Sequence, residues 1–296
     1  MPYLGELSAL ITAFLWSGTS FAFTNAAKRI GSLQLNVNRI ILATIFLFFI
    51  ILIANINYKL SDEQIYYLAL SGFAGLVLGD SFLFKSFQLI GARLGMLLMA
   101  LVPAFSSILA LVFLGEHLLL ISIIGMIITL SGISIVIMER SKDSESIFKT
   151  NKLGVLFGVL GALGQASGLV LAKFAFEAGS INGFVATFVR LLSAVVIIFP
   201  LALVFRRYKN PIKVYTKDTK ALWATLVGTI LGPVLGITGS LIAIANAQIG
   251  IASTLMSTMP IIMLPIVRYY YKETLSWRAI IGAMIAIVGV AILFLV

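Results

Sequence analysis

The sequence predicts an all-α polytopic membrane protein with ten transmembrane helices, arranged as two inverted five-helix repeats. Three observations lead to this fold class. The 296 residues are 60% hydrophobic and only 11% charged, whereas soluble globular domains carry roughly 25% charged residues. Nearly the whole chain divides into apolar runs of about 20 residues, the helix length that crosses roughly 30 Å of hydrocarbon. Finally, a pattern of prolines, glutamates and glycines in the first half returns in the second.

The apolar runs predict spans at 4–27, 33–54, 65–84, 94–114, 119–138, 153–174, 182–205, 222–245, 251–270 and 275–296. The alternation of apolar and polar residues that marks a membrane β-barrel is missing from these runs, so each span is expected to be a helix that satisfies its own backbone. The most polar stretch, ERSKDSESIFKTNK at 139–152, separates the fifth span from the sixth. We therefore expect a five-helix repeat over 1–138, a polar linker over 139–152 and a second repeat over 153–296.

The internal repeat is clearest in the last two spans of each half. At a constant separation of 157 residues, the matches are Pro103 with Pro260, Glu116 with Glu273, Leu118 with Leu275, Gly125 with Gly282 and Gly132 with Gly289. Further matches are Gly75 and Gly79 with Gly232 and Gly236 at 157, and Arg39 with Arg190 at 151. Because five is an odd number, two such units joined in tandem enter the membrane in opposite senses, as in many transporters.

The positive charge predicts orientation rather than nucleic-acid binding, although the net charge is +10. Most of the 21 lysines and arginines fall in short loops after the odd-numbered spans, whereas Lys59 and Lys173 fall on the opposite side. The positive-inside rule then puts the odd-numbered loops in the cytoplasm of a multi-pass plasma (inner) membrane protein, with both termini outside.

Composition and motifs also narrow the chemistry. The chain has no cysteine, and His117 is its only histidine, so disulfides and Cys- or His-based metal sites are not expected. Gly79-Asp80 matches half of an intramembrane aspartyl protease motif, but Val77 replaces the first glycine. Nucleotide-binding and hydrolase fingerprints are missing from the sequence as well. We therefore expect no catalytic residue, no metal and no cofactor.

One repeated pattern runs from Pro103 through LGEHLLL to Gly125 and Gly132, and it returns from Pro260 to Gly289. Two further segments are distinctive: FLWSGTSFAF in span 1 and GDSFLFKSFQLIGA, which leads into span 4. Together these segments resemble the ten-helix EamA-type permeases of the drug/metabolite transporter superfamily, over essentially the whole chain. The resemblance implies a transporter of amino acids, metabolites, nucleotide sugars or drugs that hydrolyses no ATP, and it says nothing about the cargo. Many such relatives have cytoplasmic termini, unlike the orientation that the cation distribution favours here.

Candidate substrate-binding residues lie near the predicted midplane. They are Trp16, Ser17, Thr19 and Ser20 in span 1, Met99 and Pro103 in span 4, Gln165 and Ser167 in span 6, and Ser257 and Pro260 in span 9. Polar groups at this depth face protein or a water-filled cavity, and a proline frees a carbonyl and lets its helix bend. The alternative is that these residues only pack the helices and hydrogen-bond between them.

Charged residues within spans provide a second set of candidates. Asp80 is the only acid well inside a span, and Lys85 is placed too far around the helix to pair with it. An isolated carboxylate would suit proton coupling; the alternatives are snorkelling or pairing with a cation from another helix. Arg39 and Arg190 could bind an anionic substrate or only cap carbonyls. Glu116, like its match Glu273, is expected at a helix N-terminus, where the helix dipole favours an anion.

The function that we expect is secondary transport of a small metabolite, amino acid or drug-like solute by alternating access, either proton-coupled or by facilitated diffusion. The solute would enter a cavity between spans 1, 3, 4 and spans 6, 8, 9. Its partners are the small-molecule substrate and the lipid bilayer, and the protein is a monomer or homodimer. A flippase for lipid-linked or amphiphilic substrates is the main alternative, whereas a channel and an intramembrane enzyme are disfavoured.

Overall fold

The computed structural model describes residues 3–138, 151–204, 208–270 and 276–294, and within these ranges it contains helices and turns but no strand. The first half comprises α1 (Leu4–Ile30), α2 (Ser32–Ile53), α3 (Asp62–Ser71), η1 (Gly72–Gly79), α4 (Asp80–Met99), α5 (Val102–Leu114) and α6 (Leu120–Met138). The second half comprises α7 (Lys152–Glu177), α8 (Gly183–Val204), α9 (Pro211–Lys217), α10 (Thr219–Thr229), η2 (Ile230–Gly236), α11 (Ile237–Asn246), α12 (Ile249–Met256), α13 (Met259–Tyr270) and α14 (Trp277–Phe294).

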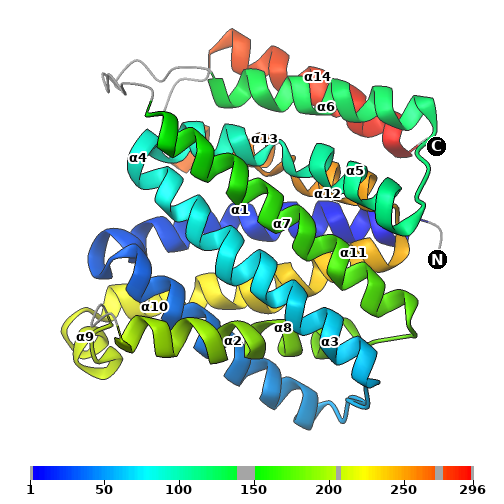
Figure 1. Cartoon of the computed structure of the whole chain (residues 1–296). Coiled ribbons are helices and arrows are strands. Elements are labelled where there is room, and N and C mark those ends of the chain that lie inside the picture. The colour runs from blue at the N-terminus through cyan, green and yellow to red at the C-terminus, as the bar shows by residue number, and fades with distance from the viewer. Residues whose placement is uncertain (1–2, 139–150, 205–207, 271–275, 295–296) are drawn as a thin grey trace.

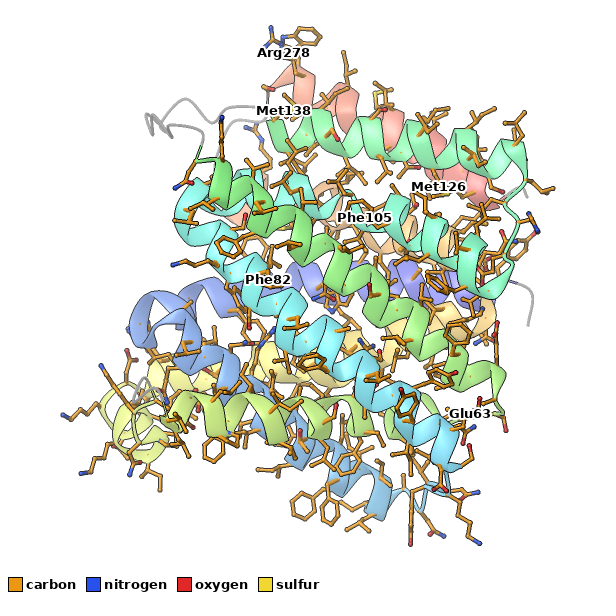
Figure 2. The ribbon with its side chains drawn as sticks, in the orientation of Figure 1. Glu63, Phe82, Phe105, Met126, Met138 and Arg278 are labelled. Atoms are coloured by element: carbon orange, nitrogen blue, oxygen red, sulfur yellow. The ribbon has the colours of Figure 1, made fainter. Side chains whose placement is uncertain are left out.

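Within these described ranges, nine helices are long and apolar enough to cross a membrane, and Ile249–Pro265 is a shorter apolar stretch. The helices run between two ends of one bundle, with both termini at one end and α9 at the other (Figure 1). Large apolar side chains on the outside, such as Phe14, Phe113 and Ile127, are more than half exposed. The labelled charged residues Glu63 and Arg278 lie at the periphery (Figure 2). This distribution suits a bundle whose sides face lipid.

The internal repeat extends to the helix boundaries. Separations of 157 residues relate the starts of α3 and α10, of α4 and α11, of α5 and α13, and of α6 and α14. The same separation relates the short breaks at Ala100–Leu101 and Ser257–Thr258, which precede α5 and α13. Helices α2 and α8 coincide at both ends when shifted by 151 residues. A pattern predicted from a few residues therefore describes how each half folds.

Each half also contains one π-helical segment, η1 or η2, in the middle of an otherwise α-helical span. The two segments end at equivalent glycines, Gly79 and Gly236. Pro233 lies inside η2, whereas the equivalent residue of η1 is Leu76, so proline alone does not account for both. Segments of π-helix inside α-helices are rare and frequently mark functional sites.

The two halves interlock rather than pack as separate bodies. Helix α1 of the first half contacts α10, η2, α11, α12 and α13 of the second, whereas α7 contacts α3, η1, α4 and α5 of the first. Helices α2 and α8 pack together, and α6 pairs with α14 along one edge (Figure 1). The first helix of each half therefore lies against the π-helical span of the other half.

The glycines of the repeated motif pack α6 against α14. A Cβ placed on Gly132 would lie 2.5 Å from both the backbone nitrogen of Ala286 and the carbonyl oxygen of Gly282. Only glycine allows the two backbones to approach this closely, as at other membrane helix interfaces. The two glycines of each motif thus have a structural role at the edge of the bundle, away from the polar centre.

The segment between the third and fourth spans differs from the expected loop. We expected a break between residues 84 and 94, but α4 continues to Met99, and the chain leaves helical geometry only at Ala100–Leu101. Little in KSFQLIGARL opposes a helix, because a single glycine within it costs only about 1 kcal/mol. Pro103 then stands at the start of α5, where its missing N–H has no helical partner to lose.

Candidate functional site

A buried ionic cluster lies where the two halves interlock. Its members are Arg39 on α2, Asp80 at the start of α4, Gln165 on α7 and Arg190 on α8. Arg39 donates from Nη2 to Oδ2 of Asp80 at 2.6 Å. Gln165 donates from Nε2 to Oδ1 of the same carboxylate at 2.7 Å. Both oxygens of Asp80 are thus hydrogen-bonded, each to a helix other than its own.

The guanidinium of Arg39 is held from three sides. Its Nε donates to Oδ1 of Asn36 at 2.8 Å. Its Cζ lies 5.3 Å from the ring centroid of Phe23 on α1 and 5.7 Å from that of Phe84 on α4. A guanidinium at this distance from an aromatic face is attracted by the ring quadrupole. These contacts fix Arg39 between three helices and leave aromatic surface next to the ion pair.

Gln165 connects the cluster to the π-helical segment η1. Besides Asp80, its Nε2 donates to the carbonyl of Gly75 at 3.0 Å. Glycine favours the close approach, because a Cβ on Gly79 would lie only 3.1 Å from the backbone nitrogen of Gln165, a tight contact. The widened helix and its glycines therefore admit a polar side chain from the other half into the middle of the span.

Arg190 is the second cation of the cluster and is only 3% exposed. Its Nε has no hydrogen-bond partner in the part of the chain that the structure describes. A Cβ placed on Gly75 would lie 3.3 Å from its Nη2 and 3.6 Å from Oε1 of Gln165. Arg190 interacts electrostatically with Asp80, although the structure records no hydrogen bond between them. The guanidinium thus faces the site without a carboxylate of its own.

The two arginines are equivalent in the repeat, but the acid is not duplicated. Asp80 corresponds at 157 residues to Ile237. The cluster therefore holds two cations and one anion, a formal excess of one positive charge. Burying a charge without a partner is costly.

These contacts correct two expectations. Asp80 is not an isolated carboxylate, because Arg39 of another helix pairs with it. Such pairing is one of the alternatives that the sequence leaves open for Asp80. Arg39 was expected to cap carbonyls at a helix end if its role is structural, yet its partners are a carboxylate and an asparagine. Hydropathy places a charged residue at a depth but does not show which neighbouring helix faces it.

Trp16 on α1 and Gln165 on α7, which are 149 residues apart, take equivalent places at two different interfaces between the halves. Gln165 lies against Gly79 of η1, and Trp16 lies against Gly236 of η2, where an added Cβ would collide with the indole Nε1. Thr19 lies against η2 as well, since a Cβ on Gly232 would stand 2.7 Å from its Cγ2. These predicted residues therefore line the two interfaces between the halves.

Most of the remaining predicted residues lie at the interfaces of α1 with α13 and of α5 with α12, whereas Met99 is on α4 and Ser167 is on α7. Ser17 donates to the carbonyl of Met259 at 3.1 Å, next to Pro260, and Ser20 contacts the sulfur of Met263 at 3.5 Å. The carbonyl of Pro103 accepts a hydrogen bond from Ser106, whose hydroxyl lies 2.9 Å from that of Ser253. Ser257 donates to the carbonyl of Ser253, and Ser167 is half-buried on α7. Trp16 and Met99 pack against one shared hydrophobic cluster that includes Ala166 and Met256.

A second ionic contact joins the α5–α6 turn to α7 and α12 at the end of the bundle where the termini lie (Figure 1). Glu116 accepts a hydrogen bond from the backbone nitrogen of Ile249 at 2.9 Å and pairs with Nζ of Lys173 at 3.4 Å. Lys173 also donates to the carbonyls of Ile244 and Ala247 at the end of α11. Glu116 is thus at a helix N-terminus as expected, but the helix is α12 of the other half. Glu273, its match, lies outside the described residues.

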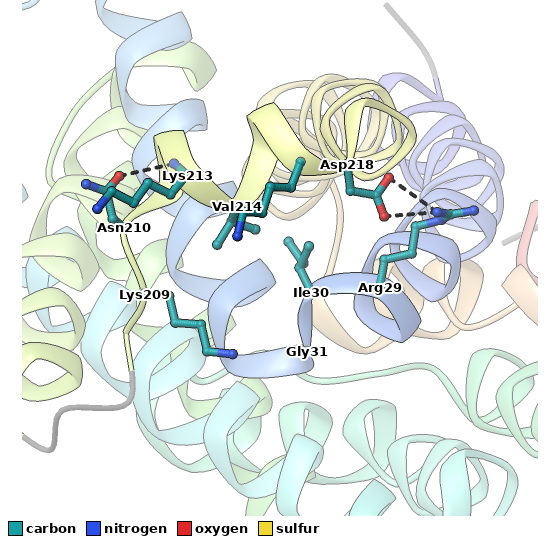
Figure 3. Close-up of a pocket in the computed structure, with 9 residues that line it drawn as sticks. Arg29, Ile30, Gly31, Lys209, Asn210, Lys213, Val214 and Asp218 are labelled. Atoms are coloured by element: carbon teal, nitrogen blue, oxygen red, sulfur yellow. Dashed lines mark hydrogen bonds and ion pairs between the residues drawn. The ribbon is translucent and has the colours of Figure 1, made fainter.

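A basic cavity of about 700 Å³ lies at the opposite end, between the α1–α2 turn and α9. Lys209, Lys213 and Lys217 line it, and Arg29 pairs with Asp218 at 2.9 Å (Figure 3). The spans expected at 182–205 and 222–245 predict a loop here, whereas the structure forms α9. The signal available in the sequence is the four-residue spacing of Lys213 and Lys217, which places both on one helix face.

Comparison with known proteins agrees with this architecture. The model of the EamA-like transporter family matches residues 3–138 and again residues 152–295. A solved structure described as "Crystal structure of protein" superposes with a TM-score of 0.82, covering 99% of this chain and 96% of its own, at 16% identity. That identity establishes a shared fold and nothing further. Among curated proteins, none matches this chain significantly.

Proposed function

The chain belongs to the EamA-like transporter family, and from this premise we propose that it is a secondary transporter that moves a small metabolite, amino acid or drug-like solute by alternating access. The proposal includes ten spans arranged as two inverted repeats in the plasma (inner) membrane. The observation that carries it is the matched pair of interfaces, α1 on η2 and α7 on η1. Two equivalent interfaces allow the halves to exchange conformations, which closes one mouth as the other opens.

The ion pairs support a specific cycle. The cycle starts from the conformation described, in which the contact of Glu116 with Lys173 and Ile249 would hold the end with the termini closed. Asp80 pairs with Arg39, and its alternative partner is the equivalent arginine of the other half, Arg190. When the halves exchange conformations, Asp80 leaves Arg39 for Arg190 and the Glu116 contact breaks. The acid thus acts as a switch between two positions that the repeat makes equivalent.

The solute binds at the interlocked centre, next to the ionic cluster and Trp16. Aromatic and apolar side chains there provide the apolar surface that small-molecule sites commonly use, and a few polar groups fix orientation. The solute moves either alone, by facilitated diffusion, or with a proton that Asp80 carries while it changes partners. A pH gradient distinguishes the two forms of transport.

The experiment that tests this function is uptake and efflux in proteoliposomes against a panel of metabolites, with and without a pH gradient. We expect saturable flux of one solute class without ATP. Flux that requires lipid-linked substrates would instead indicate a flippase, and electrical conductance at near-ionic rates would indicate a channel. A matched control is the Glu116→Gln, Lys173→Met double variant, which removes both charges of the closing contact and is expected to change the rate without changing the solute class.

A further inference from the structure

We propose that Arg190 binds the carboxylate of a monoanionic organic solute, and that Asp80 is the internal anion with which this solute competes. The inference rests on the proposed function, because it names the substrate class of the same site. It follows from three features of the ionic cluster: its charge, the unused donors of Arg190, and the access that the neighbouring side chains allow.

The charge of the cluster selects a single negative charge. Arg39 and Arg190 carry two positive charges against one on Asp80, and among the residues that the structure describes these are the charged side chains that come together here. The excess is buried with Arg190, which is 3% exposed. One carboxylate would neutralise the site, whereas a neutral or cationic solute would leave the excess charge in place.

The unused donors lie on the arginine that has no carboxylate. The Nε of Arg190 has no hydrogen-bond partner within the described ranges, whereas that of Arg39 donates to Asn36. A guanidinium presents donors in a fixed fork that matches the two oxygens of a carboxylate. Arg190 is therefore pre-organised to bind a carboxylate, and Arg39 is already occupied.

The surroundings indicate how a solute reaches the site and what the rest of it contacts. The side chains of Arg39 and Asp80 keep 15% and 11% exposure, so the solute is expected to approach the cluster from their side. Gln165 is half-buried beside them. The rings of Phe23 and Phe84 flank Arg39, so the body of a solute bound at the cluster would lie near aromatic side chains. A carboxylate on a small apolar or aromatic body fits this combination.

The test compares benzoate with its neutral isostere benzamide, by calorimetric titration and thermal stability of the purified full-length protein. We expect benzoate to bind and benzamide to bind at least about tenfold more weakly, a difference of about 1.4 kcal/mol, since only benzoate places a charge on the guanidinium. Arg190→Gln is expected to weaken benzoate binding about tenfold or more. Asp80→Asn, which removes the competing anion, is expected to tighten it. Arg29→Gln, which breaks an exposed ion pair elsewhere, is expected to leave it unchanged.

The opposite directions of Asp80→Asn and Arg190→Gln separate recognition from a merely structural role, which would weaken binding in both. Equal binding of benzoate and benzamide, or benzoate affinity that is the same in Arg190→Gln as in the wild type, would overturn the inference. Should Arg190→Gln not fold, Arg190→Lys keeps the charge without the fork, and it is expected to weaken benzoate binding. Transport of neutral solutes with no effect of benzoate would overturn this inference and leave the proposed function intact. Benzoate binding with the expected pattern but no flux of any solute would overturn the proposed function and leave the assignment of Arg190 as a carboxylate site intact.

Discussion

Trp16 of the first half lies directly against Gly236 of the second, so that a Cβ on this glycine would collide with the indole nitrogen. The contact joins α1 to the end of η2. Its equivalent on the other side of the bundle is Gln165 against Gly79, which joins α7 to the end of η1. The same interface is thus built twice, once with an aromatic and once with an amide side chain, and the ionic cluster lies on the amide side.

Gly236→Ala is expected to displace Trp16 and to lower both thermal stability and the rate of transport. Overpacking a tight contact costs about 1–3 kcal/mol. Gly18→Ala on α1 is the matched control, since its Cβ would meet only Cδ1 of Leu231 at 3.3 Å. Melting temperature and initial flux of both variants check the prediction. Trp16→Phe in the Gly236→Ala background is expected to restore part of the lost stability and flux. If it restores neither, the defect of Gly236→Ala does not arise from its contact with Trp16.

Glu116→Gln is expected to weaken the closed end of the bundle, because it removes the charge that Lys173 and the N-terminus of α12 share. The chain has no cysteine, so a single Ser253→Cys substitution reports on access to this region, where Ser253 is 2% exposed. We expect labelling by a membrane-impermeant thiol reagent to be several-fold faster in the Glu116→Gln background. Lys59→Met is the control background. Equal labelling rates of Ser253→Cys in the wild-type, Glu116→Gln and Lys59→Met backgrounds would mean that Glu116 does not hold this end closed.

Most of the spans and the repeat spacing could be predicted from the sequence, because hydropathy and the 157-residue spacing depend on single residues and their order. The helix that begins at Leu120 and the one that begins at Trp277, for example, lie within two residues of the expected starts. The expected break before residue 94 was wrong, because the end of a helix depends on local geometry that KSFQLIGARL does not specify.

The arrangement around the site could be predicted only in part. Asp80, Gln165 and the two arginines were each identified as candidates, but their grouping into one cluster depends on which helices are neighbours. The sequence gives the polarity of Trp16 and Gln165 without showing that each faces the opposite half. The π-helical segments were not predicted either, because no residue pattern distinguishes Leu76 in η1 from an ordinary helical residue.

Single cysteines at Glu145, which lies outside the described residues, and at Lys213 are expected to react from the same side of the membrane. Both positions belong to loops after odd-numbered spans, and the cation distribution puts them in the cytoplasm. Tyr58→Cys, in the α2–α3 turn, is expected to react from the opposite side; Tyr58 is 69% exposed. Labelling of intact cells and inverted vesicles checks this. Reaction of positions 145 and 213 from opposite sides would overturn the ten-span count.

Asp218→Ala is expected to lower the melting temperature more at neutral pH than in acid. Asp218 caps α10 by accepting from the backbone nitrogen of Ala221 at 2.9 Å and pairs with Arg29. The Ala221 hydrogen bond and then Arg29 lower the pKa of Asp218 below its usual 3.8. A lowered pKa stabilises the fold above pH 3.8, and this contribution is lost as the pH falls through the lowered value.

The measurement is the melting temperature of wild type, Asp218→Ala and Asp218→Asn between pH 7 and pH 3. The difference between wild type and Asp218→Ala should shrink toward the acid end. Asp218→Asn keeps a capping oxygen without the charge, so it should fall between the other two at neutral pH. A difference that stays constant over the whole pH range would show that the charge of Asp218 has no part in stability.

Counterflow in proteoliposomes tests alternating access most directly, with a solute found to move in the uptake panel. Vesicles are loaded with unlabelled solute and diluted into a trace of the labelled form. Exchange through a site that opens to one side at a time predicts a transient accumulation of label above its equilibrium level, which Arg39→Gln abolishes together with the ion pair to Asp80. Label that only rises to equilibrium, at a rate independent of the unlabelled solute inside, would contradict the account.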